Sequence, residues 1–167
     1  MNELPGTLCH LEQENGVLLA DVAVAVGERN GANSEMNRPP HTAHFTALLL
    51  HVGSTPPWPP GCAVTLAFKE TEVALAKQLS GEISLRNRQP ATVTGIGYGK
   101  LLTAVQLQFG PHPLTAVITS GSARRLELQV GDAVEWLVKA NEMQIRVAAT
   151  ETAPTSATVT GTTGADP

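Results

Sequence analysis

The sequence has few cysteines, few aromatic residues and no long apolar segment, and each shortage excludes a class of protein. Its two cysteines, Cys9 and Cys62, are too few for a disulfide framework and too far apart for a local metal clip, so we expect both to be core thiols. Aromatic residues form 4% of the chain, which argues against a base-stacking surface. The longest largely apolar run, residues 45–50, is far shorter than the roughly 20 residues of a membrane span.

Positive charge is also scarce. The chain has 11 Lys and Arg against 15 Asp and Glu, for a net charge of −4, with 42% hydrophobic residues to form a core. Residues 1–79 contain four basic and eight acidic side chains, whereas residues 80–167 contain seven of each. A general nucleic-acid binder would need a basic face, so this balance favours one local anion site. We expect a cytoplasmic protein with no membrane partner and no direct nucleic-acid partner.

An internal repeat divides the chain. Residues 2–8 resemble residues 87–93 at an offset of 85, and residues 63–69 resemble residues 133–139 at an offset of 70. Both offsets fit two copies of one unit if the first copy has an insertion near residues 27–41. That segment is rich in Gly, Asn, Pro and Glu and reads as a surface loop.

The domains predicted from this repeat are residues 1–78, residues 79–148 and a disordered tail over residues 149–167, where Thr, Ala, Ser, Gly and Pro dominate. A short helix with Ser120 near its start is expected within the second copy. The fold class that we predict is all-β, with two OB-like five-stranded barrels in tandem, each with a short helix. The strands expected in the second copy are Ala91–Ile96, Leu101–Phe109, Leu114–Thr119, Ala133–Lys139 and Met143–Val147.

Hydroxyl and cationic side chains occur together in the second copy. Ser84 and Arg86 lie two residues apart, so on an extended chain they share one face. Lys139 ends a predicted strand, and Thr119 precedes the predicted helix. A tetrahedral dianion accepts hydrogen bonds and donates none, so hydroxyl, cationic and backbone N–H donors suit it.

These motifs resemble the molybdate-binding Mop or TOBE domain family. Residues 84–87, Ser-Leu-Arg-Asn, are similar to its Ser-Ala-Arg-Asn motif, residues 114–119 to its central strand, and Lys139-Ala140 to its Lys-Ala element. The resemblance implies an OB-like fold, often in tandem, that binds molybdate or tungstate at subunit interfaces of a homo-oligomer, here a dimer or trimer. It implies no cofactor, no catalysis and no metal other than the molybdenum of molybdate. The oxyanion-binding residues that it implies are Ser84, Arg86, Asn87, Thr119, Ser122, Lys139 and Ala140.

The first copy departs from this pattern at the matching positions. Met1 stands where Arg86 would be, Leu50 stands for Thr119, and Glu70 follows Lys69 where Ala140 follows Lys139. A carboxylate would repel an oxyanion, so we expect a structural role for this copy. The chain begins inside the motif, which is compatible with a piece of a longer protein.

Three functions remain open from the sequence. The first is storage or homeostasis of molybdate or tungstate. The second is a regulatory oxyanion-sensing module of a molybdate-responsive transcription factor or of a molybdate transporter ATPase, although the chain has no helix-turn-helix segment and no phosphate-binding G-x-x-x-x-G-K-[ST] loop. The third is an OB-fold interaction module with no oxyanion role. His41 and His44, with His51 and Cys62 nearby, lack the spacing of a closed four-ligand zinc site.

Overall fold

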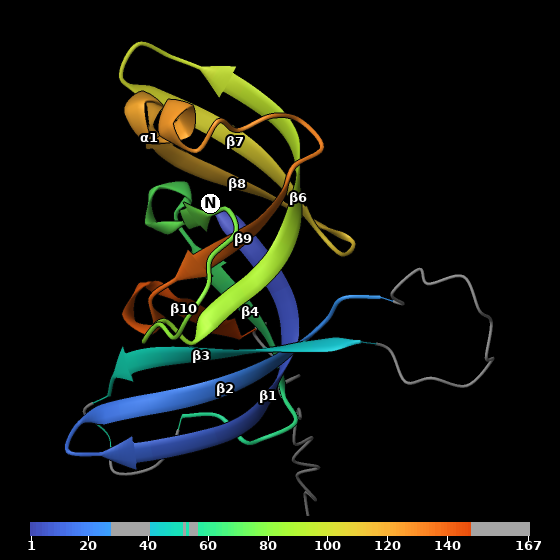
Figure 1. Cartoon of the computed structure of the whole chain (residues 1–167). Helices are drawn as coiled ribbons and strands as arrows, with labels where there is room; N and C mark the ends of the chain where they lie inside the picture. Colours follow the sequence, from blue (N-terminus) through green and yellow to red (C-terminus); the bar gives the residue numbers. More distant parts are fainter. Residues whose placement is uncertain (28–40, 52, 54–56, 148–167) are drawn as a thin grey trace, which may run out of the picture.

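The computed structural model describes residues 1–27, 41–51, 53 and 57–147. In this part of the chain, all strand pairs are antiparallel and form two curled five-stranded sheets (Figure 1). The predicted all-β fold of two OB-like five-stranded units is confirmed. The first unit contains β1 (Asn2–Glu14), β2 (Val17–Ala25), β3 (Thr42–Leu50), β4 (Ala63–Phe68), the 3-10 helix η1 (Glu70–Glu72) and β5 (Ala74–Ala76). The second contains β6 (Asn87–Tyr98), β7 (Leu102–Phe109), β8 (His112–Thr119), α1 (Ser120–Arg125), β9 (Ala133–Val138), the 3-10 helix η2 (Ala140–Glu142) and β10 (Gln144–Val147).

The repeat seen in the sequence extends to strand irregularities. The register of β1 shifts between Leu8 and His10, and that of β6 shifts between Val93 and Gly95, so each copy has a bulge at the same point. The bulge also corrects one prediction. Cys9 lies at it and is exposed, whereas Cys62 is partly buried against the core. Only Cys62 therefore approaches the core position that we expected for both thiols.

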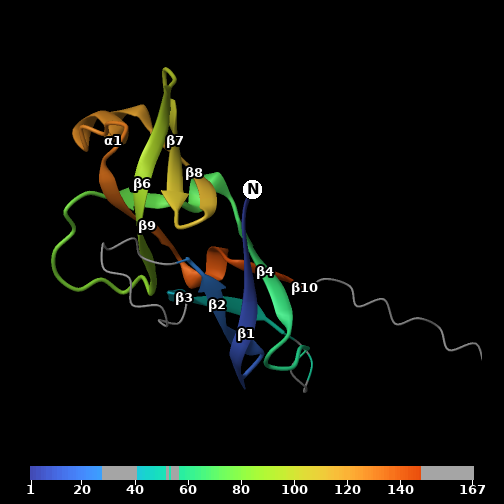
Figure 2. The same ribbon diagram turned by 90° about the vertical axis from the view of Figure 1, so that its right-hand side faces the viewer.

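The two units exchange their last strands. The first sheet has the order β10-β4-β1-β2-β3, and the second has the order β5-β9-β6-β7-β8. Each unit thus completes the sheet of the other, and Figure 2 shows the crossing of the chain between the two halves. The sequence division into residues 1–78 and 79–148 remains an interpretation of the repeat, because neither sheet is built from one contiguous segment. The predicted insertion and tail lie largely outside the described residues.

One aromatic cluster joins the sheets. The Trp136 ring of the second sheet stacks on Phe45 and Phe68 of the first, with ring centroids 5.5 Å apart in both pairs. Phe109 of the second sheet meets Phe45 and Trp136 edge to face, at 6.0 and 5.4 Å. All four residues are at most 2% exposed. Because burial of such side chains dominates core energetics, the two units share one hydrophobic core.

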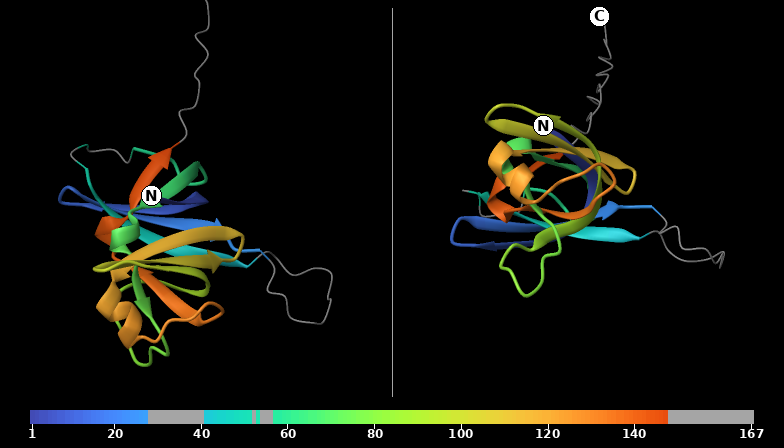
Figure 3. Two further views of the ribbon diagram at one scale, coloured as in Figure 1. Left: turned by 90° about the horizontal axis from the view of Figure 1, so that it is seen from above. Right: turned by 45° about the horizontal axis from the view of Figure 1, so that its top comes forward.

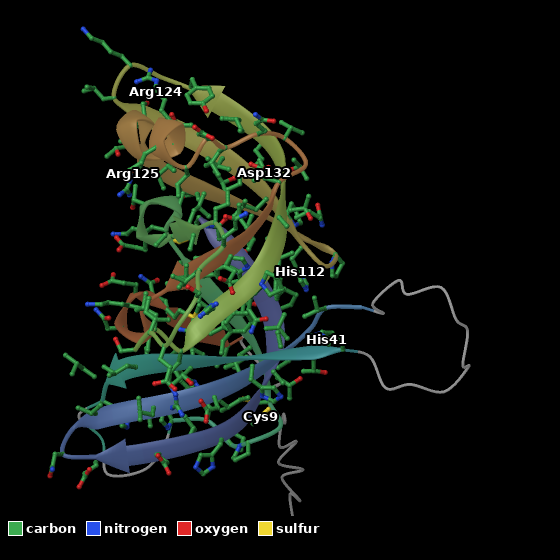
Figure 4. The ribbon with its side chains drawn as sticks, viewed as in Figure 1. Cys9, His41, His112, Arg124, Arg125 and Asp132 are labelled. Atoms are coloured by element: carbon green, nitrogen blue, oxygen red, sulfur yellow. The ribbon has the colours of Figure 1, made fainter. Side chains whose placement is uncertain are left out.

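An ion pair fastens the end of the first unit to the second. Lys77 Nζ lies 2.8 Å from Asp132 Oδ2, and Figure 4 marks Asp132 on the loop that leads into β9. The hydrogen bond from Lys77, together with one from the Gln129 backbone N–H, lowers the pKa of Asp132 below its usual value. Lys77 directly follows β5, so this ion pair lies where the chain of the first unit has joined the second sheet.

Among the described residues, no helix is long and apolar enough to cross a membrane.

Candidate oxyanion site

The segment before β6 exposes two of the predicted donors. Ser84 and Arg86 are both exposed in the irregular stretch between β5 and β6. The backbone N–H of Arg88 donates to Arg86 O at 3.0 Å, which holds the chain in a turn where it enters the strand. Solvent can reach both residues where the chain enters β6.

Lys139 and Ala140 adjoin this segment through strand pairing. Asn87 is the partner of Val138 in the β6–β9 ladder, so Arg86, just before β6, and Lys139, just after β9, flank the last pair of that ladder. Facing residues of an antiparallel pair are close neighbours. Lys139 is exposed and precedes η2, whose first residue is Ala140. The structure therefore places the chain positions of Arg86 and Asn87, at the start of β6, next to those of Lys139 and Ala140, which follow β9. Ser84 lies two residues before Arg86 in the irregular stretch that leads into β6.

The two cations at this junction have no protein partner in the described part of the chain. No side-chain hydrogen bond or ion pair is found there for Arg86 or Lys139. Arg88, by contrast, forms a bidentate salt bridge with Glu135, in which Nε and Nη2 lie 2.6 and 2.9 Å from the two carboxylate oxygens. Arg86 and Lys139, without a counterion among the described residues, create a region of positive potential at this surface, and such a region attracts an anion.

Thr119 and Ser122 lie elsewhere in the same chain. Thr119 pairs with Leu102 near the end of β6 that is opposite to Asn87. Its Oγ1 accepts from the Ser122 N–H at 3.2 Å and donates to Ser122 Oγ at 2.9 Å, so it caps α1. Figure 1 places α1 at the top of the molecule and η2 beside the arrowhead of β3, well below it. The structure thus does not join Thr119 and Ser122 to Arg86 and Lys139 within one chain.

The strand exchange explains this separation. Because each unit crosses to the other sheet, η2 lies beside β3 of the first unit and η1 lies beside β8 of the second. In Figure 3 the green 3-10 helix η1 lies beside the gold strands of the second unit. Each end of the molecule therefore combines elements of both copies. The motifs of the second copy alone gave no signal of this crossing, since it depends on which sheet accepts β5 and β10.

The neighbourhood of η1 shows the same backbone with different chemistry. Lys69, before η1, has φ −75° and ψ 150°, and Lys139, before η2, has φ −65° and ψ 145°. Ala140, however, is replaced by Glu70, whose carboxylate contacts the amino group of Met1. Leu50, the counterpart of Thr119, is 85% exposed. The geometry is repeated at both turns, but the donors are not.

Asn87 differs from the other residues of the predicted set because its side chain is 1% exposed. Its Nδ2 donates to Thr46 O at 2.9 Å, and its Oδ1 accepts from Thr46 N at 2.8 Å. Its Nδ2 also lies 3.5 Å from Met143 Sδ. The carboxamide faces the interior between the sheets and has no contact with the exposed side of Arg86 and Lys139.

Two other groups of polar residues lie apart from this junction. Arg124 and Arg125 are exposed on α1, at the upper left of Figure 4, while His41 and His112 lie on the opposite side. Among the described residues, no group of three or more His, Cys, Asp or Glu side chains is arranged to hold a metal ion.

The fold and the donors define a tandem OB-like β protein with an exposed cationic junction in its second unit. Residues 83–145 match the family model of the TOBE domain. That segment includes Ser84, Arg86, Thr119, Ser122 and Lys139, so the match confirms the resemblance predicted from the motifs.

Proteins whose names refer to molybdenum or molybdate are similar to this chain, some over less than half of its length and others over most of it. The molybdenum import ATP-binding protein ModC of Brucella abortus is 42% identical over 78 residues, which are 46% of this chain and 22% of ModC. The ModC proteins of Brucella suis and Brucella melitensis match with the same values. The chain thus spans less than a quarter of the length of these curated relatives.

Among solved structures, the cytoplasmic molybdate-binding protein ModG with molybdate bound has a TM-score of 0.72. It is 21% identical in sequence, and the alignment covers 88% of this chain and 96% of ModG. At this identity the likeness shows a common fold over both units. A molybdate-binding protein from Sporomusa ovata is 39% identical over 38% of this chain and 96% of its own, with a TM-score of 0.38.

Proposed function

We propose that the chain binds a tetrahedral oxyanion, molybdate or tungstate, at the junction of β6 and η2. The observation that carries the proposal is the adjacency of Arg86 and Lys139, two exposed cations without a side-chain partner in the described residues. Ser84 would add a hydroxyl donor and Ala140 a backbone N–H. This set supplies donors to a ligand that only accepts, and bonds from charged donors are stronger than neutral ones.

A second copy of the chain would complete the donor set. Thr119, at the end of β8, and Ser122, in α1, lie at the other end of the molecule. They therefore reach an oxyanion held by Arg86 and Lys139 only if they come from another chain. The Ser122 hydroxyl hydrogen has no partner among the described residues, because Ser122 Oγ accepts from Thr119. We therefore include a homo-oligomer, a dimer or trimer, in the proposal.

The biological role that we propose is cytoplasmic storage or homeostasis of the oxyanion, with no catalytic step. The common fold with cytoplasmic ModG over both units supports this role. A second candidate is an oxyanion-sensing module of a larger transport protein, and the 42% identity to a part of ModC favours it. Both roles use the same site and differ in what the site controls.

Calorimetric titration of the full chain with molybdate, tungstate and sulfate tests the proposal. We expect saturable binding of molybdate and tungstate, weaker binding of sulfate, and a thermal unfolding midpoint that rises with ligand concentration, because a ligand that binds only the folded state stabilises it. If none of the three anions at millimolar concentration gives heat or stabilisation, the proposal is wrong, and an OB-fold interaction module without an oxyanion role becomes the better explanation.

A further inference from the structure

The buried carboxamide of Asn87 connects the candidate site to the first unit. Asn87 begins β6 in the second sheet, and Thr46 lies in β3, an edge strand of the first sheet. The two hydrogen bonds at 2.9 and 2.8 Å use both polar atoms of the carboxamide and both polar backbone groups of Thr46. The side chain thus links the two sheets with a pair of hydrogen bonds like those between paired backbone groups.

The other end of the molecule has the same bridge. Asn2 begins β1, is 6% exposed, and exchanges two hydrogen bonds with the Thr115 backbone of β8, at 2.9 and 2.8 Å. Asn2 corresponds to Asn87 and Thr115 to Thr46 in the repeat. Two related bridges therefore hold the sheets together, which by itself indicates a structural role for both asparagines.

The surroundings of the two bridges differ in charge. Asn87 follows Arg86 directly and pairs with Val138, the residue before Lys139. Asn2 pairs with Phe68, the residue before Lys69 and Glu70. Only the Asn87 bridge, therefore, adjoins two cations that lack a partner in the described residues.

We propose that Asn87 is a positioning residue for the oxyanion donors, an inference that rests on the proposed function. Its bridge fixes the first residue of β6 and, through the ladder with Val138, the strand end that leads to Lys139. A site binds tightly when its donors are held in place before the ligand arrives. The first unit thereby shapes the site through the Thr46 backbone, although it contributes no donor of its own.

Removal of the bridge has two separable consequences. Without Asn87, the Thr46 N–H and C=O remain buried without a partner, which destabilises the fold. The end of β6 also loses its anchor beside Arg86, which weakens oxyanion binding. Loss of Asn2 has the first consequence at Thr115 but not the second, so Asn2 is the matched control.

The experiment compares Asn87→Ala and Asn2→Ala in the full chain by thermal unfolding and by molybdate titration, at a temperature where both variants are folded. We expect similar decreases in the unfolding midpoint, at least a tenfold loss of molybdate affinity for Asn87→Ala, and a change within threefold for Asn2→Ala. If either alanine variant does not fold, Asn87→Ser and Asn2→Ser repeat the comparison with one hydroxyl retained.

Two outcomes overturn the inference and identify which step failed. Equal affinities of the Asn87 variant and the wild type, or equal losses in the Asn87 and Asn2 variants, reject the positioning role while the proposed function stands. A wild-type chain that binds neither molybdate nor tungstate rejects the proposed function, and the inference with it.

Discussion

At the scale of single residues, two arginines only two positions apart differ in their partners. Arg88 is held by Glu135, with both side chains 27% exposed, so its charge is neutralised within the protein. Arg86, two residues earlier, is exposed and has no such partner in the described part of the chain. Residue type alone therefore does not distinguish the two arginines, whereas the Glu135 counterion does, and this is why Arg86 is the one proposed to bind the oxyanion.

This difference predicts how alanine variants at the two arginines behave. Arg86→Ala should lower molybdate affinity roughly tenfold to a hundredfold, because a hydrogen bond to a charged group contributes about 1.5–3 kcal/mol, and the unfolding midpoint should hardly change. Arg88→Ala should instead lower the midpoint, because Glu135 loses its partner, and leave affinity within about threefold. Titration and thermal unfolding of both variants check this, and an affinity loss at Arg88→Ala that equals the loss at Arg86→Ala would contradict it.

At the scale of elements, η1 and η2 share one backbone conformation but differ in the charge of their first residue, Glu70 in η1 and Ala140 in η2. Each follows a lysine in an extended conformation, and in each the third residue of the turn donates its N–H to that lysine carbonyl at 3.1 Å. The motif tolerates alanine or glutamate at its first position, as Ala140 and Glu70 show. The backbone is therefore the same in both elements, and the proposal assigns the difference in anion binding to the side chain at this first position.

Ala140→Glu gives η2 the residue that η1 has at the equivalent position, Glu70. It should abolish most molybdate binding by charge repulsion. The fold should remain intact, because the same backbone conformation already accepts glutamate in η1. Asn141→Glu is the control: it adds the same charge to the neighbouring exposed position of η2 and should reduce affinity far less. Circular dichroism and calorimetry measure the two effects. Equal affinity losses in the two variants would show that net charge, and not the position of the carboxylate, governs binding.

At the scale of the whole molecule, strand exchange places the two halves of the proposed donor set at opposite ends. Lys139 leads into η2, which lies beside β3, and Thr119 ends β8, which lies beside η1. A contact between two chains that joins unlike ends can close into a ring. Leu101 and Leu102, 76% and 53% exposed near Thr119, and Leu50, 85% exposed at the end of β3, provide apolar surface for such a contact.

A mixing experiment checks whether the site is shared between chains. Arg86→Ala chains and chains with both Thr119→Val and Ser122→Ala should each bind molybdate weakly. Oligomers formed by refolding the two together should regain part of the wild-type sites, because some interfaces then combine an intact Arg86 with an intact Thr119. Titration of the mixture measures this recovery, and light scattering measures the assembly. No recovery from mixed oligomers, or a wild-type monomer with full affinity, would place the whole site within one chain.

The sequence by itself determined the local features. The spacing of turn signals predicted the strands, the repeat predicted two related units, and α1 begins at Ser120, inside the predicted helical segment. The motifs placed Arg86 and Lys139 next to expected strands, and the structure has them directly before β6 and after β9; their role as donors stays a prediction. Each of these signals can be read within a short segment of the chain.

Only the tertiary structure decided how distant segments combine. No local pattern encodes that β10 pairs with β4 of the first sheet and β5 with β9 of the second. This arrangement also leaves Thr119 and Lys139 at different ends of the molecule, and it brings the carboxamide of Asn87 against Thr46 of the other sheet. Asn87 was predicted as a donor because it belongs to the motif of residues 84–87 that resembles the Mop or TOBE family. Its burial follows from an edge strand 41 residues away in sequence, since a buried amide must find its hydrogen-bond partners wherever the fold brings them.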